Sequence, residues 1–245
     1  MAKYLDETMW WDALGKPNWY IRLVKDFKQL ELRAEQQEND PNHKEIKGEA
    51  YTLVERALRE NHVLLGVSGE DFDRERRPID TIVIHHTKNS PGMTLDRLNA
   101  MQLLRIYGEY YANPTEDQRF LRGQPIWSGH FYNDRQVFWG YHWLIRTNGA
   151  AEQILGDQYV GWHAGNWSVN TRSIGICIDN DLSNEAPSKT VLNAVVGIIR
   201  RHYQDVPSAN IIGHHDANFS TACPGNLFYA VWRQQLITAL GSDIQ

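Results

Sequence analysis

Two histidine pairs and one cysteine are the residues of this chain that could hold a metal ion. His85 and His86 directly follow an apolar run, and His214 and His215 follow a second, shorter one. Cys223 lies nine residues beyond His214. Zinc prefers imidazole nitrogen and thiolate sulfur, and a catalytic zinc site uses three protein ligands and one open position for water. One histidine of each pair, together with Cys223, would supply that set.

The same residues also allow a structural interpretation. A histidine at the end of an apolar strand is commonly a hydrogen-bonded structural residue, and the spacing of eight residues between His214 and Cys223 is weak evidence on its own. A purely structural zinc site would need a fourth protein ligand, which this pattern lacks. Adjacent side chains of a strand point to opposite faces, so only one histidine of each pair can face a metal.

The elements that must position these residues alternate between strands and helices. The β-branched run 79–84 predicts a strand that ends at His85. Further strands are expected at 140–146 and 151–155, around the turn Asn148-Gly149, and at 173–179 and 210–212. Helical periodicity covers 94–110, 189–203 and 228–240, and the stretch 113–136 is irregular. This order predicts an α/β fold with a mixed central β-sheet flanked by helices.

The first third of the chain has a different pattern. Apolar residues recur at helical spacing from Tyr20 to Ala34 and from Ile46 to Leu58, and the stretch 66–71 is typical of a linker. We therefore expect a helical N-terminal extension at 1–75 and a second domain at 76–245. The apolar faces of the extension need a surface to cover them, either within this chain or on a partner protein.

Composition and charge exclude several classes of protein. The formal net charge is −5, with 11 basic and 16 acidic residues in 1–75 and 14 of each afterwards, which argues against a nucleic-acid-binding surface. Membrane insertion is not expected, because no stretch approaches about 18 uninterrupted apolar residues. Two cysteines, Cys177 and Cys223, are too few for a disulfide framework. The start lacks an apolar signal core, so we expect synthesis in the cytoplasm.

Four blocks of residues resemble, in order, the motifs of the zinc-dependent N-acetylmuramoyl-L-alanine amidases. This family includes phage amidase-type lysozymes, bacterial muropeptide amidases and animal peptidoglycan recognition proteins. The blocks are IVIHHT at 82–87, GYHWLI at 140–145, WHAG at 162–165 with SIGI at 173–176, and GHHD at 213–216 with TACPG at 221–225. The resemblance extends over about residues 79 to 240, and it implies the fold of the peptidoglycan recognition proteins.

Carried over position by position, the resemblance implies that His85, His214 and Cys223 bind Zn²⁺. It places Tyr141 beside the metal, where the hydroxyl would hold water or the oxyanion of the tetrahedral intermediate. Thr221 matches a position that is lysine or threonine in other members, and its hydroxyl either assists the oxyanion or supports the loop.

The resemblance also implies a substrate-binding groove. His163 matches a substrate-facing histidine of the family motif. The aromatic residues around it, Trp162 and Trp143, either line the groove or pack in the core. In the muropeptide-recycling branch, carboxylates stand where this chain has Cys177 and Cys223, so the match favours the phage-lysozyme and recognition-protein branches.

The expected activity is hydrolysis of the amide bond between N-acetylmuramic acid and L-alanine of peptidoglycan. An endolysin, which acts on the cell wall after it passes a permeabilised membrane, fits best with these residues. The alternatives are a peptidoglycan-binding receptor without catalysis and a cytosolic muropeptide-recycling amidase. Cys223 disfavours the receptor, because that class is expected to lack the ligand cysteine.

Overall fold

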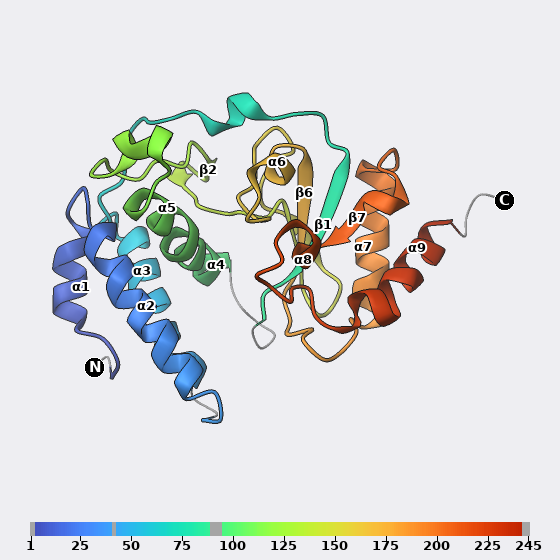
Figure 1. Ribbon diagram of the computed structural model, residues 1–245, viewed down its shortest axis with the longest axis horizontal. Coiled ribbons are helices and arrows are strands. Elements are labelled where there is room, and N and C mark those ends of the chain that lie inside the picture. Colours follow the sequence, from blue (N-terminus) through green and yellow to red (C-terminus); the bar gives the residue numbers. More distant parts are fainter. Residues whose placement is uncertain (1–2, 41–42, 89–94, 242–245) are drawn as a thin grey trace. The chain divides into compact units, whose positions relative to one another are not determined.

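In the computed structural model, which describes residues 3–40, 43–88 and 95–241, the chain divides into two units (Figure 1). The helical unit contains the described residues up to Asp71 and those from 95 to Phe138. The sheet unit contains the described residues from Phe72 to 88 and from Trp139 onwards.

Five strands form the central sheet of the sheet unit, in the order β5-β4-β6-β1-β7. Their bounds are β1 (Thr81–His86), β4 (Trp143–Ile145), β5 (Ala151–Gln153), β6 (Ser173–Ile178) and β7 (Ile211–Gly213). β1 runs parallel to β6 and β7, and β4 runs parallel to β6, whereas β5 pairs antiparallel with β4. The predicted mixed sheet is therefore confirmed.

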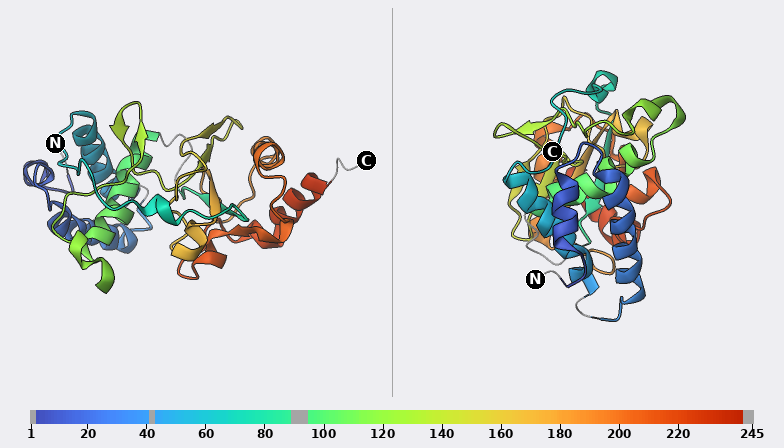
Figure 2. Two further views of the ribbon diagram at one scale, coloured as in Figure 1. Left: turned by 90° about the horizontal axis from the view of Figure 1, so that it is seen from above. Right: turned by 90° about the vertical axis from the view of Figure 1, so that its left-hand side faces the viewer.

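One face of this sheet carries the main hydrophobic core of the unit. The helices α7 (Lys189–His202) and α9 (Arg233–Gly241) lie side by side (Figures 1 and 2), and the π-helical turn η5 (Phe228–Trp232) leads into α9. Their apolar side chains pack with every second residue of the strands. The core residues from β1 and β6 are Ile82, Ile84, Ile174, Ile176 and Ile178. Large β-branched residues suit a strand face that is fully covered by helices.

The opposite face of the sheet carries smaller elements. The short helices α6 (Trp167–Asn170) and α8 (His214–Ala217) contribute to a small apolar cluster built on Val83. The 3₁₀ turns η1 (Phe72–Glu75) and η4 (Ser208–Asn210) precede β1 and β7 along the chain. α8 follows β7 without a break, so its first residue, His214, lies at the carboxyl end of β7, which is paired with β1.

The helical unit is built from α1 (Glu7–Leu14), α2 (Tyr20–Gln36), α3 (His43–Arg59) and the continuous helix α4 (Leu95–Gln102), η2 (Leu103–Gly108) and α5 (Glu109–Ala112). Most of the apolar residues expected at helical spacing within 20–34 and 46–58 are buried, and α2 and α3 pack on each other. The 3₁₀ turn η3 (Glu116–Leu121) and the small hairpin of β2 (Phe131–Tyr132) and β3 (Arg135–Gln136) follow.

The division of the chain differs from two consecutive domains at 1–75 and 76–245. The segment between β1 and β4 joins the helical unit, because α4 packs on α3 and α5 packs on α2. The buried Tyr20 hydroxyl donates to the carbonyl oxygens of Leu121 and Gln124 at 3.2 and 2.9 Å and accepts from Gly123 N–H at 2.6 Å. The apolar faces of α2 and α3 are thus covered within this chain.

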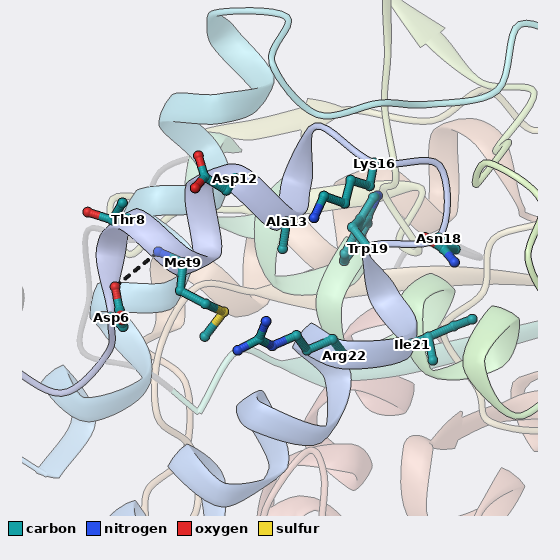
Figure 3. A pocket seen from close by; sticks show the side chains of 10 residues that line it. All are labelled: Asp6, Thr8, Met9, Asp12, Ala13, Lys16, Asn18, Trp19, Ile21 and Arg22. Carbon is teal, nitrogen blue, oxygen red and sulfur yellow. Dashed lines mark hydrogen bonds between the residues drawn. The ribbon is translucent and has the colours of Figure 1, made fainter.

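The helical unit also contains a hollow of about 480 Å³ beside α1 and α2 (Figure 3). Residues of both charges line it, among them Asp12, Lys16 and Arg22, together with Met9 and Trp19. None of the residues that the sequence marks for chemistry belongs to it. Among the helices in the described ranges, none is long and apolar enough to cross a membrane.

Candidate metal and catalytic site

His85, His214 and Cys223 come together at the carboxyl end of the sheet. Their ligand atoms all lie within 4.8 Å of one another, and His85 Nδ1 is 3.9 Å from Cys223 Sγ. The His85 and His214 rings are 4.6 Å apart between centroids. Zinc–nitrogen and zinc–sulfur bonds of about 2.0–2.3 Å put two ligands of one tetrahedral ion roughly 3.5 Å apart. The donor types and distances therefore fit a zinc ion after small side-chain movements.

Strand register explains why residues so far apart in the sequence meet. His85 lies opposite Cys177 on β6, and Ile84 lies opposite Gly213, the last residue of β7. The chain leaves β7 as His214, one step beyond that pair. Because β1 and β7 run parallel, His85 and His214 lie at the same carboxyl end of the sheet.

Small side chains on β6 leave room for a buried histidine on the same face as His85. Ser173, Gly175 and Cys177 alternate with the core isoleucines of this strand. A Cβ atom on Gly175 would lie 2.8 Å from Cγ of His163, which is too close. The glycine of the SIGI motif therefore allows the His163 ring to lie directly on the strand.

His163 is the immediate neighbour of the candidate metal ligand His85. Its Nδ1 lies 2.9 Å from His85 Nε2, and its Nε2 lies 3.3 Å from the Ser173 hydroxyl. The side chain is only 4% exposed. His163 is therefore a buried neighbour of the candidate ligand His85, and the substrate-binding role that the resemblance implies stays a prediction.

Tyr141 is the aromatic neighbour of the cluster. Its ring centroid lies 4.9 Å from that of His85, and the side chain is half-buried. Burial raises the pKa of the nearby Cys177 thiol well above its ordinary value, and a hydrogen bond with Tyr141 opposes the rise. The phenol ring is thus beside the candidate ligand His85, and Tyr141 is partly open to solvent.

Burial controls the protonation of the ligands. Desolvation lowers the pKa of His85 well below its ordinary value, and neighbouring His214 and His163 lower it further. Burial raises the pKa of the Cys223 thiol to about 12, while a hydrogen bond from His86 N–H opposes the rise. The imidazole of His85 is thus in the neutral form that binds metals. The thiolate of Cys223 would need a cation beside it, which coordination provides.

The sequence profile of the N-acetylmuramoyl-L-alanine amidases matches residues 75–226, which is more than half of the chain. The chain belongs to this family. The matched range includes all three candidate ligands and Tyr141. It also spans the segment from 95 to Phe138, which in this amidase-family chain belongs to the helical unit.

Individual relatives match over shorter or more distant stretches. A 93-residue stretch is 33% identical to an endolysin of Enterobacteria phage K11, and the match covers 35% of this chain and 58% of that relative. The amidase LysC from Clostridium intestinale is 20% identical over 69% of this chain and 90% of its own, with a TM-score of 0.45. The Drosophila peptidoglycan recognition protein SD is 21% identical over 64% of this chain and 80% of its own, with a TM-score of 0.42.

The second histidine of each pair supports Cys223, the third candidate ligand of this amidase-family site. His86 donates its backbone N–H to Cys223 Sγ at 3.4 Å, and its ring Nδ1 accepts from Leu182 N–H at 2.9 Å. His215 donates its backbone N–H to the Cys223 carbonyl, and its Nδ1 lies 2.9 Å from the same oxygen. Each pair thus provides one candidate ligand and one residue that holds the loop of the third ligand.

Thr221 belongs to the turn that carries Cys223. Its hydroxyl accepts from Cys223 N–H at 3.2 Å, while Asn218 accepts from Ser220 at the start of the turn. The glycine of the WHAG motif, Gly165, has a φ of +61° and approaches the same turn closely, because a Cβ there would lie 2.4 Å from Asn218 Nδ2. These contacts favour the loop-supporting alternative for Thr221.

The two tryptophans expected in a substrate groove are largely buried. Trp143 is 8% exposed and lies in the main core on the α7 face of the sheet, where its Nε1–H donates to the Tyr203 hydroxyl at 2.7 Å. Trp143 thus lies on the opposite face of the sheet from His85, and its expected role in substrate binding stays a prediction. Trp162 packs edge-on against Phe72 and Trp167, and it is also 8% exposed.

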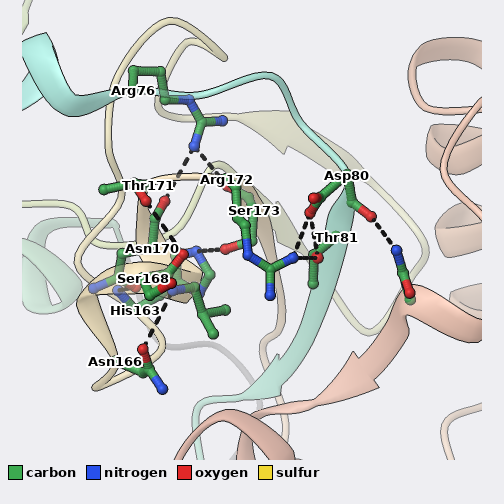
Figure 4. A network of polar contacts seen from close by, with 12 residues as sticks. Arg76, Asp80, Thr81, His163, Asn166, Ser168, Asn170, Thr171, Arg172 and Ser173 are labelled. Atoms are coloured by element: carbon green, nitrogen blue, oxygen red, sulfur yellow. Dashed lines mark hydrogen bonds and ion pairs between the residues drawn. The ribbon is translucent and has the colours of Figure 1, made fainter.

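A polar network around His163 was missed by sequence reasoning (Figure 4). Asn170 Oδ1 accepts from the backbone N–H groups of His163 and Ala164 at 3.3 and 2.8 Å. Arg76 Nη1 donates to the carbonyl oxygens of Asn170 and Ser173 at 3.1 and 3.0 Å. The one sequence signal for this network was the run of small residues at every second position of 173–177, which predicts a bulky neighbour on that face.

Proposed function

We propose that this chain is a zinc-dependent amidase and an endolysin. Its substrate would be the amide bond between the lactyl group of N-acetylmuramic acid and L-alanine in peptidoglycan. The observation that carries the proposal is the convergence of His85, His214 and Cys223 within 4.8 Å beside Tyr141, in a chain of the N-acetylmuramoyl-L-alanine amidase family. The endolysin name of the phage K11 relative supports the cell wall as the place of action.

His85 Nδ1, a ring nitrogen of His214 and Cys223 Sγ would hold the zinc ion. When bound, zinc supplies Lewis-acid chemistry, since it polarises a carbonyl and lowers the pKa of water toward about 7. Two neutral imidazoles and one thiolate leave a net charge of +1 on the site, which favours attack on an uncharged amide. The donor set therefore suits hydrolysis at neutral pH.

Tyr141 would act on the oxyanion that forms when the amide carbonyl is attacked. Its phenol O–H can donate a hydrogen bond, and its ring lies against that of His85, so the hydroxyl is held near the ligand cluster. A donor that is fixed in place before the reaction stabilises the developing charge without reorganisation. His86 and His215 keep the Cys223 loop in position while substrate binds.

Mass spectrometry of purified peptidoglycan after incubation with the zinc-loaded protein tests this proposal. We expect intact stem peptides with a free L-alanine amino group, and glycan strands that keep the lactyl carboxylate. Release of disaccharides or of shortened peptides would contradict the assigned bond. Binding of fragments without any cleavage would instead favour the receptor.

Metal content gives the second test. Elemental analysis of the pure protein should find about one zinc ion per chain, because three ligands of the preferred types converge at one place. A chelator should abolish cleavage, and added zinc should restore it. A protein that contains no zinc and is not activated by zinc would disprove the metal assignment.

A further inference from the structure

We infer that His163 is a positioning residue, which accepts the Nε2 proton of His85 and so directs Nδ1 of His85 toward the metal. This inference rests on the zinc site of the proposed function. Both ring nitrogens of His163 are engaged, one with His85 at 2.9 Å and the other with Ser173 at 3.3 Å. The ring is 4% exposed, so these partners replace water.

The hydrogen bonds that link His85, His163 and Ser173 all point in one direction when a metal is bound. A neutral imidazole has one donor and one acceptor nitrogen, and a metal takes the acceptor. His85 Nδ1 faces Cys223 Sγ at 3.9 Å, so Nδ1 is the ligand atom and Nε2 carries the proton. That proton must be donated to His163 Nδ1, and the proton of His163 then lies on Nε2 and is donated to the Ser173 hydroxyl.

Without a metal, the same two hydrogen bonds can both point in the opposite direction. A Ser173 hydroxyl proton would then go to His163 Nε2, and His163 Nδ1–H would go to His85 Nε2, which leaves the His85 proton on Nδ1. That form has a proton where the ion would bind. The relay therefore couples metal binding to the tautomers of two histidines, and His163 provides the acceptor on which the metal-bound tautomer depends.

The surroundings of His163 hold the ring in this position. Gly175 provides the surface beneath it, because any side chain there would meet the ring at 2.8 Å. Asn170 fixes the backbone of His163, and Arg76 fixes the carbonyl oxygens of Asn170 and Ser173. The backbone of His163 and its partner Ser173 are thus both held within this hydrogen-bond network, as an orienting residue requires.

The test compares zinc affinity in two variants by competition with a chromophoric chelator. His163→Leu fills the space without an acceptor, so His85 Nε2–H loses its partner, and we expect zinc affinity to fall about 10- to 100-fold. His163→Asn places an amide oxygen near the position of Nδ1 and should recover much of that loss. His130→Leu, which replaces a buried histidine of the helical unit, is the matched control and should bind zinc as the wild type does.

Nitrogen NMR of ¹⁵N-histidine-labelled wild type gives a readout that needs no variant. In the zinc-loaded protein, His163 should show a protonated Nε2 and an unprotonated Nδ1, and the pattern should change when zinc is removed. A His163→Leu protein that folds and binds zinc within twofold of the wild type would overturn the inference. So would a zinc-loaded wild type with the His163 proton on Nδ1. If the wild type itself binds no zinc, the proposed function fails instead.

Discussion

The two faces of the central sheet are made from the same strands but have different roles. On β6, Ile174, Ile176 and Ile178 point to the α7 face and join the main core. Ser173, Gly175 and Cys177 point to the other face, where His163 and the candidate ligand His85 lie. One strand therefore alternates between residues that stabilise the unit and residues that make space for chemistry.

Side-chain size, more than polarity, distinguishes the face of the sheet near the candidate site from the face that carries the core. A buried isoleucine contributes roughly 1.5–3 kcal/mol of hydrophobic stabilisation, whereas serine, glycine and cysteine contribute much less. The core on the α7 face supplies the hydrophobic stabilisation of the sheet unit that the other face lacks. Substitutions on the core face should then change stability, and substitutions near His85 should change metal binding or turnover. Four experiments test whether the faces separate in this way.

The largest effect is expected for Cys223→Ser. Serine keeps the size but replaces a soft thiolate by a hydroxyl, which is a poor zinc ligand. A bound metal stabilises the transition state by several kcal/mol, so its loss corresponds to a fall of about 1000-fold or more in turnover. Zinc content and cleavage rate measure this.

Cys177→Ser is the matched control for Cys223→Ser. Cys177 is buried and lies opposite His85, but its ligand atom is not part of the cluster. It should keep its zinc and most of its activity. A folded Cys223→Ser protein that cleaves at the wild-type rate would remove this residue from the site.

Tyr141→Phe should have the next largest effect. It removes the phenol O–H while the ring against His85 remains, so zinc content should stay at the wild-type level. Loss of one oxyanion donor lowers kcat about 100- to 1000-fold in other enzymes, and a half-exposed donor can cost as little as about 10-fold. Steady-state kinetics with a soluble muropeptide measure it. Unchanged kcat would make Tyr141 a packing residue.

Ile176→Ala tests the core face directly. Ile176 is fully buried against the helices, so its truncation should lower the free energy of unfolding by about 2–5 kcal/mol. Zinc affinity and kcat of the folded fraction should not change. Denaturant unfolding and chelator competition on the same sample give both values. A stable variant with impaired zinc binding would contradict the separation of the faces.

Trp143→Phe should have the smallest effect and tests whether this residue acts in the core or in substrate binding. The change removes the hydrogen bond to Tyr203 and part of the ring, so a loss of about 1–2 kcal/mol of unfolding free energy is expected. KM should be unchanged, because the ring faces the core. A raised KM with unaltered stability would return Trp143 to the substrate groove.

Sequence patterns predicted the sheet because strands depend on local rules, and the resemblance to the amidase family implied the candidate ligands. The alternation within 173–179 and the β-branched run before His85 each specify a strand, and the motif order places both histidine pairs at strand ends. Imidazole and thiol side chains are restricted to few kinds of site, so their types narrow the chemistry to a metal such as zinc.

The positions of His163 and Trp143 could not be predicted in the same way. Both lie in motifs that resemble substrate-binding segments, yet which face a side chain takes depends on strands and helices far away in the sequence. Trp143 is in the core because β4 pairs with β6 and α7 covers that face. His163 lies on Gly175 because the loop after β5 returns over β6.

The placement of 95–138 shows the same limit on a larger scale. Periodicity predicted a helix over 94–110, and α4, η2 and α5 form one from Leu95 onwards, but no local signal assigned that helix to the N-terminal bundle. The sequence by itself determined the elements, the candidate ligands and the family. Only the tertiary structure decided which surfaces cover one another, because burial is set by the sum of long-range contacts and not by the pattern of any single segment.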